Sequence, residues 1–99
     1  MSAGFGISDA QLTRVKEICT TLSSVGRAVV FGSRSMGNYR EGSDLDICLI
    51  DRGMTFSELL SIQSQIENLN LPIHCDIIRF STIQNDQLRE HIERAGVEL

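Results

Sequence analysis

The sequence predicts an α/β (α+β) fold, with one small mixed β-sheet of three or more strands and helices packed on one side. Segments of helical and strand periodicity alternate in the order helix, strand, loop or short helix, strand, helix, strand, helix. The first two strands are joined by a short polar loop, which favours antiparallel pairing, and a helix joins the next two, which favours parallel pairing. A length of 99 residues fits a single domain over residues 1–99.

The first helix and the first two strands follow from local signals. Ser8 and Gln11 have the spacing of a capping box, and apolar residues at helical spacing continue the helix over about residues 9–23. Residues 28–31 form a short apolar run bounded by glycines, which indicates a buried strand. The apolar run over residues 45–50 indicates the second strand.

The second half of the chain repeats these signals. Thr55 and Glu58 form another capping box, and the helix that they begin should stop before Pro72. Residues 73–78 indicate the third strand. Ser81 is the predicted N-cap of a last helix.

Composition excludes several classes of protein. A net charge of −4 and a pI near 5.0 argue against a surface that coats nucleic acid. No apolar run approaches 18 residues and no leader opens the chain, so membrane insertion and secretion are not expected. The three cysteines, Cys19, Cys48 and Cys75, have no metal-binding spacing and indicate reduced thiols of a cytoplasmic protein.

Most of the candidate metal-binding and phosphate-binding residues lie between residues 32 and 46. Asp44 and Asp46 alternate at the start of the second strand, so their side chains point to one face, about 7 Å apart. Parallel pairing with the third strand would bring Asp76 beside them. Carboxylates that converge in this way suit two Mg²⁺ ions, although two aspartates alone are also typical of a solvated strand face.

The loop before these aspartates offers groups for a phosphate. Gly32 permits close backbone approach, and Ser33 with the backbone amides that follow can cradle an anion, especially if a helical turn starts near Ser35. Arg34 and Arg40 could hold phosphate oxygens, the alternative being solvated loop charges. A phosphate-binding loop opposite a site for divalent cations predicts nucleotidyl or phosphoryl transfer.

These residues carry a resemblance to a known family. It is carried by Gly32-Ser33-Arg34, by the ten residues that separate Ser33 from Asp44, by the run Gly42-Ser43-Asp44-Leu45-Asp46, and by Asp76 on the next strand. The family that they resemble is the minimal nucleotidyltransferases of the DNA polymerase beta-like superfamily. The resemblance covers nearly the whole chain. It implies the polymerase beta-like fold and transfer of AMP from ATP to a hydroxyl, with release of pyrophosphate.

The resemblance also implies a role for each site residue. Asp44 and Asp46 would ligate two Mg²⁺ ions, and Asp76 would complete one metal shell and help to activate the acceptor hydroxyl. The residues expected to bind the nucleotide and its phosphates are Gly32, Ser33, Arg34, Arg40 and Ser43.

The family further suggests a partner. Small members pair with a helical HEPN-domain protein encoded nearby, and in some pairs they act as antitoxins by adding AMP to a tyrosine of that toxin. In the alternative reading, the chain is the catalytic subunit of a two-component enzyme that modifies a small molecule. Ser35 and Met36 replace a small and a basic residue that the family often carries, so a catalytically weak antitoxin that binds nucleotide and acts by contact is a third reading. A homo- or hetero-oligomer is plausible.

Overall fold

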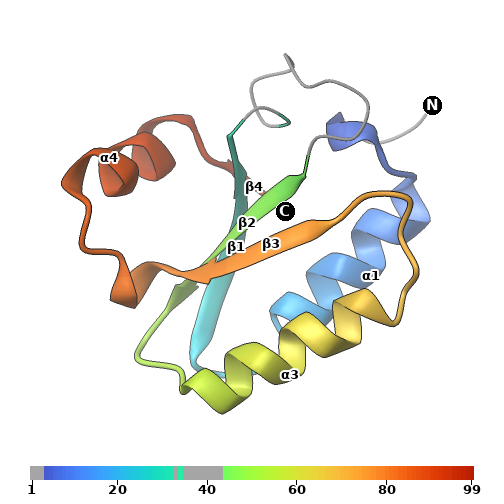
Figure 1. The fold of residues 1–99 in the computed structure, drawn as a ribbon, viewed down its shortest axis with the longest axis horizontal. Helices are drawn as coiled ribbons and strands as arrows, with labels where there is room; N and C mark the ends of the chain where they lie inside the picture. The colour runs from blue at the N-terminus through green and yellow to red at the C-terminus, as the bar shows by residue number, and fades with distance from the viewer. Residues whose placement is uncertain (1–3, 33, 35–43) are drawn as a thin grey trace.

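The computed structural model describes residues 4–32, 34 and 44–99 (Figure 1). The predicted helical turn near Ser35 and most of the predicted phosphate loop lie outside these residues. In chain order the elements are η1 (Gly4–Gly6), α1 (Asp9–Cys19), β1 (Val25–Phe31), β2 (Leu45–Asp51), α3 (Phe56–Glu67), β3 (Cys75–Arg79), η2 (Phe80–Thr82), α4 (Asp86–Ala95) and β4 (Val97–Glu98).

The strands form one mixed sheet in the order β3-β2-β1-β4. β1 pairs antiparallel with β2, and β2 pairs parallel with β3, which confirms both predicted pairings. β4 was not predicted, because two residues are too few to show strand periodicity; it pairs antiparallel with Val29 and Val30 of β1. The fold class predicted from the sequence is therefore confirmed.

Alternation along β2 separates two apolar clusters. Leu45, Ile47 and Leu49 are fully buried in the larger cluster, to which α1 and α3 contribute. Cys48 faces the other way and packs with Ile92 of α4 in a smaller cluster. The expectation of helices on one side therefore holds for α1 and α3, whereas α4 covers the opposite face of the sheet (Figure 1).

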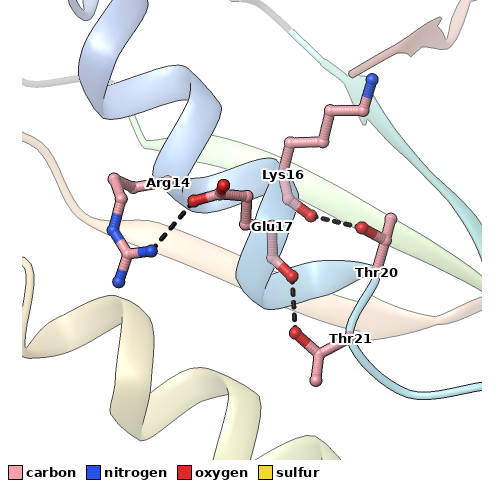
Figure 2. Close-up of polar contacts among 5 residues, drawn as sticks. All are labelled: Arg14, Lys16, Glu17, Thr20 and Thr21. Atoms are coloured by element: carbon pink, nitrogen blue, oxygen red, sulfur yellow. Dashed lines mark hydrogen bonds and ion pairs between the residues drawn. The ribbon is translucent and has the colours of Figure 1, made fainter.

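α1 begins as predicted and ends earlier, at Cys19 instead of Ser23. The hydroxyls of Thr20 and Thr21 donate to main-chain carbonyls of the last turn, at 2.8 and 2.6 Å (Figure 2). The accepting carbonyls belong to Lys16 and Glu17. Threonine side chains that satisfy these carbonyls locally offer an alternative to further helical turns, which accounts for the early end.

The last helix also differs from its prediction. Its N-cap is Asn85, whose side chain accepts from the Leu88 amide, and not Ser81. Ser81 donates both its amide, at 2.9 Å, and its hydroxyl, at 2.6 Å, to the carboxylate of Asp51. This contact holds Ser81 against Asp51, the last residue of β2. The residues around Ser81 therefore form η2, and α4 begins only at Asp86.

Both predicted capping boxes are present, at Ser8 with Gln11 and at Thr55 with Glu58. Each fixes the first turn of a helix whose apolar residues reach the larger cluster. Within the residues that the structure describes, no helix is long and apolar enough to cross a membrane.

Candidate functional site

Three carboxylates gather where β1 ends and where β2 and β3 begin. In the sheet register, Asp46 lies opposite Phe31 on one side and Asp76 on the other. The Leu45 amide donates to the His74 carbonyl at 2.8 Å, which fixes the start of β2 against the start of β3. Alternation along both strands puts Asp46 and Asp76 on the face of the sheet that α4 shares, and the exposed Asp44 immediately precedes β2.

Gly32 follows β1 directly and lies against the carboxylate of Asp46. Its φ is +77°, a left-handed conformation that side chains other than glycine rarely adopt. A Cβ added here would lie 2.6 Å from Oδ2 of Asp46. Only glycine therefore allows the main chain to approach the Asp46 carboxylate this closely.

The other two carboxylates affect the pKa of Asp46. Partial burial raises its pKa above the usual value of 3.8, and the negative charges of Asp76 and Asp44 raise it further. A cation placed between these side chains would relieve the repulsion. Among the residues that the structure describes, however, no three His, Cys, Asp or Glu side chains are grouped so that they could hold a metal ion.

Arg34, which the sequence predicts to hold phosphate oxygens, is buried in the structure and is not a solvated loop charge. The side chain of this residue is 4% exposed, and Nη1 donates to the main-chain carbonyl of Phe5 at 2.8 Å. Burial raises the pKa of the Cys75 thiol to about 11, and the positive charge of Arg34 opposes that rise. The structure thus gives its guanidinium a partner within the protein, and the predicted phosphate contact stays a prediction.

The other predicted nucleotide-binding residues, Ser33, Arg40 and Ser43, lie outside the described residues. Two contacts beside the site were not anticipated from the sequence. His91 of α4 packs edge-on against Phe31, with ring centroids 6.4 Å apart, so α4 reaches the strand position opposite Asp46. The Phe5 carbonyl reaches Arg34 across 29 residues of sequence, and no local pattern signals such a pairing.

Comparison with solved structures supports the fold. A structure described as a toxin-antitoxin with AMP-PNP superposes with a TM-score of 0.71 at 13% identity, covering 93% of this chain and 72% of that one. A protein assigned as a minimal nucleotidyltransferase gives a TM-score of 0.69 at 28% identity, over 92% and 87% of the two chains. A protein from Sulfolobus solfataricus assigned as a nucleotidyltransferase gives 0.50 at 17% identity, over 91% and 82%.

Sequence comparison gives the family. No curated protein matches the chain. Residues 13–99, which include every carboxylate of the site and all the strands, match the family described as "Polymerase beta, Nucleotidyltransferase". The chain belongs to this polymerase beta nucleotidyltransferase family.

Proposed function

We propose that this chain is a Mg²⁺-dependent adenylyltransferase that moves AMP from ATP to a hydroxyl of a partner protein. The observation that carries the proposal is the sheet register, in which Asp46 lies between Phe31 and Asp76 while Gly32 touches its carboxylate. Membership of a nucleotidyltransferase family supports the reaction class. The chain would act as one domain over residues 1–99, in the cytoplasm, where its three free, buried cysteines stay reduced.

The donor set fits Mg²⁺ in kind, because Mg²⁺ prefers carboxylate oxygens and a cation would offset the repulsion that Asp76 and Asp44 exert on Asp46. In this proposal Asp44 and Asp46 would hold two ions and Asp76 would complete one shell. Bound Mg²⁺ would supply charge neutralisation and alignment of the triphosphate.

The chain's own groups would then position the reactants. Gly32 leaves room for phosphate oxygens at the end of β1, and Ser33, Ser43 and Arg40 are the proposed further nucleotide contacts. Arg34 is not among them, because its guanidinium bonds to the Phe5 carbonyl. The acceptor hydroxyl oxygen bonds to the α-phosphorus while the bond from that phosphorus to the bridging oxygen breaks. Pyrophosphate leaves, and the hydroxyl proton passes to the carboxylate of Asp76.

The proposed acceptor is a tyrosine of a helical HEPN-domain toxin, and the chain would act as its antitoxin. The structural neighbour described as a toxin-antitoxin with AMP-PNP supports a toxin partner and a nucleotide substrate. A small-molecule acceptor held by a partner subunit remains the alternative, and both readings use the same site. Neither calls for direct binding of nucleic acid, in keeping with the net charge of −4.

The test is pyrophosphate release from ATP and Mg²⁺, with and without the co-expressed partner, followed by intact mass measurement of the partner. We expect turnover that needs the partner and a mass gain of one or more AMP units on it. Asp46→Asn should abolish both, whereas Asp51→Asn, at the other end of the same strand, should retain them. An unmodified partner beside a modified small compound would favour the small-molecule reading.

A second candidate is an antitoxin that binds nucleotide and acts by contact alone. It is favoured by the burial of Arg34, which turns one predicted phosphate ligand toward the protein. Inhibition of the toxin by the chain, with no pyrophosphate release in either condition, would support this candidate and refute the transferase.

A further inference from the structure

Arg34 is the only charged or polar residue that is buried in the described part of the chain. A guanidinium stays charged at all relevant pH values, and removing it from water is costly unless hydrogen bonds compensate. Its Nη1 donates to the Phe5 carbonyl at 2.8 Å, within the short range of charge-assisted bonds. Such a side chain has little freedom, so its main chain, two residues after Gly32, is held as well.

The acceptor of this bond is itself fixed. Phe5 has φ +73° and Gly6 has φ +86°, so the turn carries a conformation that is unfavourable for phenylalanine. Phe5 packs against the larger apolar cluster, Ile7 is 2% exposed within it, and Ser8 caps α1. A strained residue persists only where its surroundings determine it, and here those surroundings include the Arg34 guanidinium.

We propose that Arg34 is a positioning residue, which ties the N-terminal turn (residues 4–8) to the chain after β1 and thereby keeps Gly32 against Asp46. The inference rests on the proposed function for its effect on nucleotide binding. It assigns the N-terminal turn, which lies outside the residues that match the family, to the support of the site. Arg34 acts here through the loop and not by touching phosphate.

Two variants perturb the two ends of this bond. Arg34→Lys keeps the charge but loses the planar fork and its reach, and Gly6→Ala disfavours the left-handed turn that presents the Phe5 carbonyl. Arg79→Lys is the matched control for the first, because Arg79 donates to the Met54 carbonyl at 3.1 Å away from the site. Gly53→Ala is the control for the second, since Gly53 has φ +78° and open space around it.

The measurements are hydrogen exchange of peptides over residues 4–8 and 28–32, and binding of a non-hydrolysable ATP analogue with Mg²⁺. We expect Arg34→Lys and Gly6→Ala each to speed exchange in both peptides about tenfold, the effect of one lost bond to a charged group. Each should weaken analogue binding by about the same factor. The double variant should be no worse than the more affected single variant, because both act on the same bond. The controls should bind the analogue like wild type, and any loss of global stability in them should speed exchange along the whole chain and not selectively in these two peptides.

Three results would overturn the inference. Weaker analogue binding in Arg34→Lys with unchanged binding in Gly6→Ala would mean that Arg34 contacts the nucleotide directly. Losses that multiply in the double variant would mean two independent effects. If both peptides exchanged no faster in Arg34→Lys and Gly6→Ala than in the controls, the bond from Arg34 to Phe5 would not hold the two segments together. If wild type bound no nucleotide, the proposed function would fail, while the exchange comparison would still decide the role of Arg34.

Discussion

Replacing Gly32 with alanine tests the close approach between the main chain and the Asp46 carboxylate. The substitution has two separable effects. Alanine at φ +77° costs about 1–2 kcal/mol of stability, because the left-handed region brings Cβ too near the carbonyl oxygen. The new Cβ also lies 2.6 Å from Oδ2 of Asp46, so the carboxylate has to move by about 1 Å to reach an ordinary contact.

The second effect should dominate activity. A displacement of about 1 Å in a catalytic group can cost roughly 10²-fold in rate, and the Asp46 side chain can rotate without unfolding the protein. We therefore expect Gly32→Ala to lose about 1–2 kcal/mol in the free energy of unfolding and roughly 10²-fold in turnover. Urea unfolding and pyrophosphate release measure the two quantities on the same preparation.

Gly53→Ala isolates the contribution of the contact. Gly53 has nearly the same φ, +78°, but an added Cβ meets nothing within 4 Å. It should show a similar loss of stability with wild-type turnover. If Gly32→Ala turned over as fast as Gly53→Ala, the approach of Gly32 to Asp46 would have no role in the reaction.

Three further predictions concern charges and caps. Asp44→Asn and Asp46→Asn should each reduce pyrophosphate release by at least about 10²-fold, which is about 2.7 kcal/mol of lost charge stabilisation, while circular dichroism stays unchanged. Wild-type turnover in either variant would contradict the two-metal assignment. Hydrogen bonds from Ser81 and Met54 outweigh burial and lower the pKa of Asp51, so its contribution is complete above the unfolded value of 3.8 and is lost as the pH falls through the folded value. Asp51→Asn should therefore cost about 1 kcal/mol at pH 7 after solvent screening, with a smaller difference at pH 2 in urea unfolding; an equal difference at both pH values would refute this. Thr55→Ala removes the cap of α3 and should lower the free energy of unfolding by about 1 kcal/mol, whereas an unchanged urea midpoint would show that the cap contributes nothing.

The predictable part of the fold depended on local signals. Capping boxes at Ser8 and Thr55 placed two helix starts correctly, because an N-cap side chain bonds to an amide only three residues away. Where a distant partner intervened, local patterns failed. Ser81 resembles an N-cap in sequence, but Asp51, 30 residues earlier, binds its amide and hydroxyl and moves the cap to Asn85.

The site shows the same division. The alternation of Asp44 and Asp46 and the order of the strands were enough to bring Asp76 next to Asp46, which the parallel register confirms. The environment of Arg34 depends on a carbonyl 29 residues away, and an arginine in a polar loop has the same sequence pattern whether it faces solvent, phosphate or protein. The position of α4 was likewise hidden, because an apolar stripe indicates that a helix is buried and not which face of the sheet it covers.

Because the pKa of Asp46 is raised, the ionisation of this carboxyl affects the free energy of unfolding. In the unfolded chain this carboxyl ionises near 3.8, whereas in the fold burial, Asp76 and Asp44 hold its proton to higher pH. As the pH rises above 3.8, the unfolded state ionises first, so ionisation of Asp46 removes stability until the pH passes the folded value. The fold therefore keeps the Asp46 carboxylate beside Asp76 and Asp44 at a cost at neutral pH. A polar substitute that relieves this repulsion, Asp46→Asn, should keep or raise the free energy of unfolding at pH 7 while turnover is lost. Such an exchange of stability for activity distinguishes groups held for chemistry from groups held for the fold.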